Sequence, residues 1–322
     1  MSSALGVRKY WFYVLACSVL GLAISLNVNA EVDRATLAKV SASLVKVQVD
    51  LANGGIGIGT GVVVARSKVI TNCHVIKEAE RIQLVQEGIQ WNVIATSNDM
   101  HHDLCLLTVP GLNLPAIKLG STEQLSVGDE VAAAGFAFGS RAHYAQGNVN
   151  GLHTYDSSRV VRTTAQFYPG DSGGALVDKN GQLVGILSFF SEAGTGSYFA
   201  VPVDWFAARI ANRQTYKPIA PIVELPFWYR PSLAELPYFL QAANLESRSQ
   251  WTSLMDLAQA WIRREPNNPE AWLARGNALQ ALGDSASAAQ AHDHAATIYA
   301  ILEQRAAPPI LAAKAVTVST RE

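Results

Sequence analysis

Hydrophobic and polar residues alternate in short runs through the middle of the chain, from about residue 43 to residue 203. In residues 44–50 apolar and polar side chains alternate almost strictly, and two β-branched runs flank a polar turn within 61–71. A period of two in short segments separated by turns is typical of an all-β sandwich or barrel. Gly-containing turns at 87–88 and 179–181 indicate two hairpins. We therefore predict a mainly β domain over residues 31–212.

The pattern changes after residue 212. Five prolines recur within 213–244, with aromatic residues between them, and prolines at this density exclude a continuous helix. We interpret this segment as a linker whose aromatic side chains pack on a neighbouring surface. From residue 245 the chain is alanine-rich with a helical period, which predicts a small all-α domain over 245–305 and a tail over 306–322.

The first 30 residues have the features of a secretory signal. Arg8 and Lys9 precede an apolar run that extends to about Leu26, and small residues end the segment at Ala30. A charged start, an apolar run and a small-residue end are typical of a signal peptide. A retained membrane anchor is the alternative interpretation, and contact with a membrane is expected only in that case.

Composition excludes several classes of function. The chain has 25 basic and 26 acidic residues, a net charge of −1, and no basic block, so a nucleic acid is not an expected partner. The glycine-rich stretch 54–61 does not match the dinucleotide-binding motif and leads into a strand instead of a helix. We expect no cofactor.

Three segments of the β domain carry residues suited to nucleophilic catalysis. His74 follows a β-branched strand in "VITNCHVI", Asp103 precedes an apolar run in "HHDLCLL", and Ser172 lies in "PGDSGG". Hydrolysis of an amide by serine needs a hydroxyl, a base, a group that orients the base, and donors for the oxyanion. The sequence offers each of them.

The sequence offers two alternatives to this triad. Asp99 is a rival to Asp103, but no apolar strand follows it directly. A zinc site could be built from Cys73, His74, Cys105 and one of the histidines 101 and 102, whose residue types suit the metal. Such a site would consume the triad and leave "GDSGG" unexplained, so we expect no metal.

The motifs "TNCHV", "HDLCLL", "GDEVAAAG", "GDSGGALV", "LVGILSF" and "YFAVPVD" occur in the order found in trypsin/chymotrypsin-like serine proteases. Over roughly residues 40–212 the chain resembles this family, and the residues of its motifs are most similar to those of the bacterial exported HtrA/Deg-like branch. The resemblance implies a chymotrypsin-like double β-barrel with the active site between the barrels. No recognisable PDZ module follows, unlike typical HtrA chains.

The resemblance also implies a role for each motif residue. His74 would be the general base, Asp103 its orienting carboxylate and Ser172 the nucleophile, with the backbone N–H groups of Gly170 and Ser172 as the oxyanion hole. The specificity pocket would be lined by three residues that lie before and after the nucleophile in the chain, namely Gln166, Ser188 and Phe190. With no acid at 166 and a bulky side chain at 190, we expect small aliphatic residues before the scissile bond.

Two further expectations depend on the same assignment. His74 and Asp103 must touch for the triad to work, and Cys73 and Cys105 each lie within two residues of one of them, so a disulfide is predicted beside the active site. No activation site precedes the domain. Asp171, next to the nucleophile, must therefore have a partner other than a newly formed amino terminus, and the sequence does not name it.

The helical segment resembles one tetratricopeptide repeat. The positions where that repeat needs bulky or small packing residues carry suitable side chains, namely Trp272, Gly276, Leu279, Ala288 and Ala295. A preceding, less regular repeat would end at Pro266. Two interpretations stay open: a repeat that binds a protein partner or substrate, and a plain helical hairpin that covers the protease.

These observations predict a periplasmic or secreted serine endopeptidase that acts on proteins or peptides through an acyl-enzyme. The alternative is a non-catalytic protein-binding module built on a protease fold. The intact triad and "GDSGG" favour the enzyme, because a binding module has no chemical need for all of them.

Overall fold

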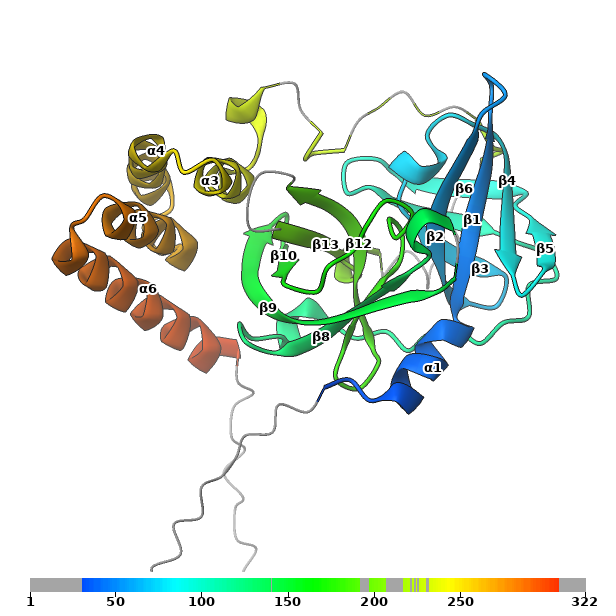
Figure 1. Cartoon of the computed structure of the whole chain (residues 1–322), viewed down its shortest axis with the longest axis horizontal. Coiled ribbons are helices and arrows are strands. Elements are labelled where there is room, and N and C mark those ends of the chain that lie inside the picture. Colours follow the sequence, from blue (N-terminus) through cyan, green and yellow to red (C-terminus); the bar gives the residue numbers. More distant parts are fainter. Residues whose placement is uncertain are drawn as a thin grey trace, which may run out of the picture.

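Two β units lie next to each other, and a layer of helices covers one side of the second (Figure 1). The computed structural model of the chain describes residues 31–139, 141–191, 197–206, 217–220, 222, 224, 226–229 and 232–306. Both units are built from antiparallel strands. The mainly β, double-barrel architecture predicted from the sequence is confirmed, together with helices at the C-terminal side.

The first unit is a seven-stranded sheet with the strand order β5-β4-β1-β2-β3-β7-β6. Its strands are β1 (Leu44–Leu51), β2 (Ile56–Ala65), β3 (Lys68–Thr71), β4 (Ala79–Gln86), β5 (Ile89–Asn92), β6 (Ala95–Asp99) and β7 (Leu104–Thr108). In β1 the valines at 45, 47 and 49 are fully buried while the polar residues between them are only partly buried. Alternation therefore places one face of the sheet in the core.

The second unit is a closed barrel with the strand order β10-β13-β12-β11-β8-β9. Its strands are β8 (Glu130–Gly135), β9 (His143–Tyr155), β10 (Ser158–Thr163), β11 (Ala175–Asp178), β12 (Leu183–Ser191) and β13 (Ser197–Pro202). In β8 Ala132 and Ala134 join one core cluster and Ala133 joins another. This strand is buried on both faces, which explains its run of small apolar residues.

Helices begin and end the described chain. α1 (Arg34–Ala42) starts at Asp33, whose side chain accepts hydrogen bonds from the N–H groups of Ala35 and Thr36. The N-cap fits the preference for Asp at this position, but the segment was not predicted to be helical. The C-terminal helices are α3 (Tyr238–Ser247), α4 (Trp251–Arg264), α5 (Pro269–Ala281) and α6 (Ser285–Ala306). Short 3-10 turns occupy His74–Ile76, Thr122–Gln124, Ala137–Gly139 and Leu233–Glu235.

The predicted linker ends earlier than expected, because α3 begins at Tyr238, directly after the last proline of the segment. Pro237 precedes the first helical turn, where its missing N–H does no harm. The linker does pack on the barrel, as expected from its aromatic residues. Phe227 is 2% exposed, whereas Tyr229, two residues later, is 66% exposed. No helix within the described ranges is long and apolar enough to span a bilayer.

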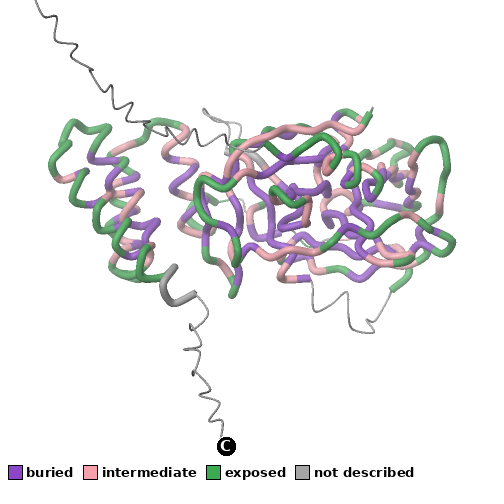
Figure 2. Tube along the Cα trace, turned by 90° about the horizontal axis from the view of Figure 1, so that it is seen from below, coloured by how far each residue is buried: buried purple, intermediate pink, exposed green. Residues whose placement is uncertain are grey.

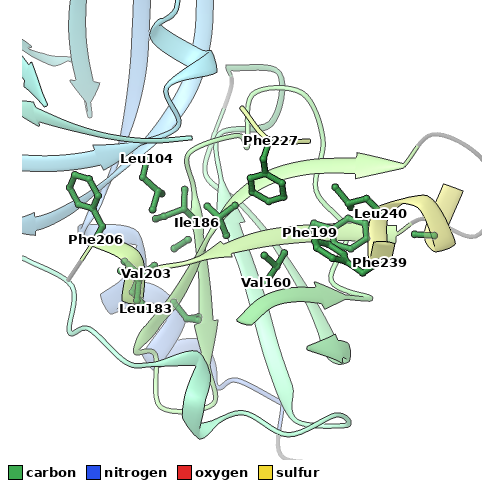
Figure 3. Close-up of a cluster of buried hydrophobic side chains, with 14 of the residues drawn as sticks. Leu104, Val160, Leu183, Ile186, Phe199, Val203, Phe206, Phe227, Phe239 and Leu240 are labelled. Atoms are coloured by element: carbon green, nitrogen blue, oxygen red, sulfur yellow. The ribbon is translucent and has the colours of Figure 1, made fainter. Parts of the chain in front are cut away.

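One continuous core cluster connects the sheet, the barrel, the linker and the helices. Figure 3 shows side chains from all four parts in this cluster, including Leu104 of β7, Phe199 of β13, Phe227 of the linker and Phe239 of α3. Two further clusters fill the seven-stranded sheet and the barrel separately. Buried positions accordingly run through both β units and along the inner sides of the helices (Figure 2).

Candidate active site

His74 is positioned by the end of strand β3. The chain leaves β3 at Thr71, whose hydroxyl donates to the carbonyl of Thr60 at 2.6 Å, and His74 opens a short 3-10 turn three residues later. The side chain of His74 is 33% exposed. A strand end thus presents this imidazole at the surface between the two β units.

Asp103 lies in the turn before β7 and holds His74 in two ways. Its Oδ1 accepts the backbone N–H of His74 at 2.7 Å, and its Oδ2 lies 2.5 Å from Nδ1 of the same residue. The carboxylate is fully buried, and the backbone φ of Asp103 is +58°, in the left-handed region. Asp tolerates this conformation better than most residues. Both contacts fix the imidazole so that Nδ1 carries the shared proton and Nε2 is left for chemistry.

The electrostatics of this pair favour a basic imidazole. Burial alone would favour neutral His74, but the Coulombic attraction of Asp103 and their hydrogen bond outweigh it and raise the pKa of His74. Complete burial also raises the pKa of Asp103, although the attraction and hydrogen bonds from His74 oppose that shift. The ring of His74 therefore binds a proton more readily than a free imidazole does.

Ser172 lies in a loop whose glycines are required by close approach of the backbone. The carbonyl of Ser172 accepts the N–H of Thr60 at 2.8 Å, which joins the loop to strand β2. Gly173 has φ +85°, and a Cβ placed there would lie 2.1 Å from the carbonyl oxygen of Thr60. A side chain at 173 would push the loop away from the sheet that carries His74.

Two backbone donors beside Ser172 are left open. Within the described residues, neither the N–H of Gly170 nor that of Ser172 donates to a protein acceptor. Gly170 has φ +100°, and its carbonyl accepts the hydroxyl of Thr60 at 2.7 Å. An unpaired pair of N–H groups next to a serine hydroxyl can stabilise an oxyanion.

The sequence could not identify the partner of Asp171, and the structure provides His143. Asp171 is fully buried, and its Oδ2 accepts the N–H of Tyr168 at 2.9 Å and lies 3.3 Å from Nδ1 of His143 on β9. Burial raises the pKa of Asp171, against the effect of the Tyr168 hydrogen bond and the His143 imidazole. No local signal could have identified His143, because the register of β9 brings it to the loop.

Cys73 and Cys105 are joined by a disulfide with a Cα–Cα distance of 5.0 Å. The bridge connects the residue before His74 to the strand that follows Asp103. Like the hydrogen bonds between His74 and Asp103, the disulfide connects the segment after β3 to the segment at the start of β7. The zinc site that would use Cys73 and Cys105 as ligands is therefore excluded, since both thiols are oxidised in the disulfide.

The three residues expected in a specificity pocket have different environments. Gln166 is exposed, and its Oε1 accepts the hydroxyl of Tyr168 at 3.0 Å. Ser188 is buried, and its hydroxyl oxygen accepts Nδ2 of Asn72 at 2.7 Å. The side chain of Phe190 lies outside the described residues. A role for these residues in selecting substrates stays a prediction.

A cavity of about 1250 Å³ lies away from this site, between the barrel and the helices. His153 of β9 and Glu270 of α5 line it and are hydrogen-bonded in its wall, with both side chains less than 10% exposed. The ring of His153 also stacks on Phe239 of α3 at 4.5 Å between centroids. Polar contacts thus join the two parts in addition to the shared core.

Comparison with known proteins gives the same picture for the β domain. Residues 59–186 match the family of trypsin-like peptidase domains. A probable periplasmic serine endoprotease of the DegP-like type from Chlamydia trachomatis is 32% identical over 155 residues, which are 45% of this chain and 31% of that protein. The periplasmic pH-dependent serine endoprotease DegQ of Escherichia coli is 33% identical over 158 residues, 45% of this chain and 35% of its own length. The chain therefore spans about a third of the length of these relatives.

Solved structures agree on the fold. The active form of the Rv3671c protease from M. tuberculosis superimposes with a TM-score of 0.54 at 22% identity, over 60% of this chain and 92% of that one. The HtrA-type protease AlgW with a tripeptide gives a TM-score of 0.50 at 26% identity, over 55% of this chain and 61% of that one. None of these matches extends over the full chain.

Proposed function

We propose that this chain, whose residues 59–186 carry a trypsin-like peptidase domain, is an exported serine endopeptidase. The observation that carries the proposal is the doubly bonded His74–Asp103 pair, together with the hydrogen bond that ties the Ser172 carbonyl to strand β2 of the same sheet. A base oriented through both its backbone and its ring, on the sheet to which the loop of a serine with open N–H groups is bonded, is suited to acyl transfer.

In the proposed reaction, Ser172 Oγ attacks the carbonyl carbon of the scissile bond as its proton moves to Nε2 of His74. The negative charge that develops on the carbonyl oxygen is stabilised by the N–H groups of Gly170 and Ser172. The imidazolium then gives its proton to the leaving amine, and the acyl group stays on Ser172 as an ester. Water, deprotonated by His74, releases the acid, while Asp103 stays ionised throughout.

The proposed location is the periplasm or the outside of the cell. The signal-like residues 1–30 and the Cys73–Cys105 disulfide support export, because disulfides persist in oxidising compartments. The relatives from Chlamydia trachomatis and Escherichia coli are named periplasmic endoproteases. The proposed substrates are proteins or peptides with a small aliphatic residue before the scissile bond, since Gln166 offers no charge to Lys or Arg.

The helices α3–α6 are proposed to bind a partner or a substrate. Their assignment to tetratricopeptide repeats stays a prediction. The alternative function, a binding module without catalysis, is favoured by one observation, the cavity between the barrel and the helices. A cavity of this size with charged side chains in its lining is suited to binding a ligand, and such binding does not need Ser172.

A serine-directed fluorophosphonate probe separates the two functions. The exported chain should be labelled once, at Ser172, and Ser172→Ala should lose labelling and at least about 10⁴-fold in kcat. The matched control is Ser253→Ala, which removes an exposed hydroxyl from α4 and should leave labelling unchanged. A wild-type chain that folds but takes no probe and cleaves no peptide library would favour the binding module.

A further inference from the structure

A second cluster of ionisable side chains lies beside the candidate triad and plays no part in the reaction proposed above. His101 and His102 precede Asp103 in the turn between β6 and β7, and Asp156 lies in the turn between β9 and β10. One potential ligand atom from each of these three residues lies within 4.8 Å of the other two. The cluster bridges the seven-stranded sheet and the barrel.

We propose that His101, His102 and Asp156 form a zinc site, with a water molecule as the fourth ligand. Two imidazoles and one carboxylate are a ligand set that zinc prefers. Bonds of 2.0–2.1 Å in tetrahedral geometry separate neighbouring ligand atoms by about 3.3 Å. Asp156 Oδ2 lies 2.8 Å from Nε2 of His102 and 3.7 Å from Nε2 of His101, on either side of that value.

The ring of His102 is already held in the orientation that a metal needs. Its Nδ1 bonds Oδ2 of Asp99 at 2.9 Å, and its backbone N–H donates to Oδ1 of the same carboxylate at 3.3 Å. A carboxylate on the far nitrogen of a ligating histidine fixes the tautomer and makes the near nitrogen a better ligand. Nε2 of His102 is therefore the nitrogen presented to Asp156.

The other two ligands are also supported by their surroundings. The carbonyl of Asp156 accepts the indole N–H of Trp205 at 3.0 Å, and the Trp205 ring lies 4.1 Å from that of His102. The carbonyl of His101 accepts the N–H of Phe227 at 3.3 Å, which anchors it to the linker. Nε2 of His101 lies 3.3 Å from the hydroxyl of Tyr155, a contact that it would exchange for the metal.

In the metal-free chain, a proton on Nε2 of His102 makes its contact with Asp156 a hydrogen bond. Zinc would displace that proton, since a ligating imidazole must be neutral. Bound metal would then connect the turn that contains Asp103 to the barrel. The expected consequence is a more stable junction between the two β units, without a new group in the reaction itself.

The test is zinc binding to the exported Ser172→Ala chain, treated with chelator and dialysed, so that the result does not depend on peptidase activity. Calorimetry should show one equivalent of ZnCl₂ bound, with MgCl₂ unable to compete. Asp156→Asn, an exposed and isosteric change, should weaken binding more than Asp99→Asn, for which the expected loss is roughly 10- to 100-fold. At a hundredfold excess over Kd, zinc should raise the Tm by about 5 °C or more.

Two controls distinguish this site from other histidines. His292→Ala removes an imidazole from α6 and should leave binding unchanged, whereas His102→Ala should abolish it. If His102→Ala does not fold, the loss of zinc affinity in Asp156→Asn tests the site without it. Undiminished binding in Asp156→Asn, binding that disappears only in His74→Ala, or no binding by the wild-type sequence would each overturn the proposal.

Discussion

His74 controls how the activity of the proposed enzyme should depend on pH. Only the neutral imidazole can accept the proton of Ser172, and Asp103 raises the pKa of His74 above its ordinary value of about 6.5. The active form is therefore lost as pH falls through a value above 6.5. We expect the acidic limb of a kcat/KM profile, measured with a chelator present, to have its midpoint above about 6.5.

Asp103→Asn provides the control for that profile. The variant keeps the size of the side chain but removes the charge, so kcat should fall by roughly 10⁴-fold and the remaining acidic limb should move to lower pH. A wild-type midpoint below that of free imidazole, or a limb that does not move in the variant, would contradict the assignment of His74 as base.

His143 should affect catalysis without touching the substrate. Its imidazole lies next to the buried Asp171, which lies between the two residues proposed for the oxyanion hole. His143→Ala leaves that carboxylate without its neighbour, and the loop should shift. We expect kcat to fall by up to about 10²-fold, the effect of losing one oxyanion donor.

A lysine at 143 should restore most of the loss, because it places a polar partner for the Asp171 carboxylate at the same end of β9. A merely structural role would lower the Tm of His143→Ala and leave kcat unchanged. The kcat of a fully folded sample therefore decides between the two roles.

At the residue scale, the sequence identified the residues of local motifs and missed the partners that depend on register. The positions of His74, Asp103 and Ser172 follow from short motifs around each residue. His143 and Asp156 carry no such motif. They reach their partners only because β9 and the following turn have a particular register in the barrel.

The Cys73–Cys105 bridge should add stability with little effect on chemistry. It closes a loop with a sequence separation of 32 residues, for which the chain-entropy model gives roughly 3–4 kcal/mol. We expect the double variant Cys73→Ala, Cys105→Ala to lose about that much free energy of unfolding in urea titrations. Two alkylated thiols in freshly purified, non-reduced wild-type chain would show that the bridge does not form.

At the scale of elements, Phe227 is a buried aromatic side chain of the linker, and its neighbour Trp228 also stacks on Phe189 of the barrel. Phe227 is buried and stacks on Tyr155 of β9 with 4.5 Å between ring centroids. Phe227→Ala should lower the free energy of unfolding by about 3–5 kcal/mol, as for other buried aromatic residues. Tyr229→Ala, two residues away and exposed, should change it by less than about 0.5 kcal/mol. Equal effects of the two changes would mean that the linker does not depend on Phe227.

The elements differ in how well their sequences predicted them. The hairpin of β4 and β5 was predicted, because Gly88 supplies the positive φ that its turn needs. Helix α1 was not predicted, since its nine residues show little separation of apolar and polar faces. Only its Asp33 cap signals a helix. Closure of the second barrel depends on the pairing of β10 with β13 and of β11 with β8, which joins strands that are far apart in the sequence.

At the scale of the whole molecule, the pair His153–Glu270 joins the barrel to α5. Both side chains are buried, so Glu270→Ala would leave the His153 imidazole without its hydrogen-bond partner and would add empty space beside it. We expect a loss of about 3 kcal/mol and a lower Tm by calorimetry. Replacing both residues by apolar ones, His153→Leu with Glu270→Leu, should recover most of that loss. If Glu270→Ala alone left the Tm unchanged, the pair would not hold the helices to the barrel.

The core shared by the barrel and the helices has a consequence for how such a gene can be recombined. Phe199 of β13 and Phe239 of α3 are buried in one cluster, together with Phe227 between them in the chain. If the gene were divided at Pro237, the protease part and the helical part would each expose their side of this cluster to water. The helices therefore cannot be exchanged between relatives as a free cassette: a crossover must carry the matching barrel surface with it.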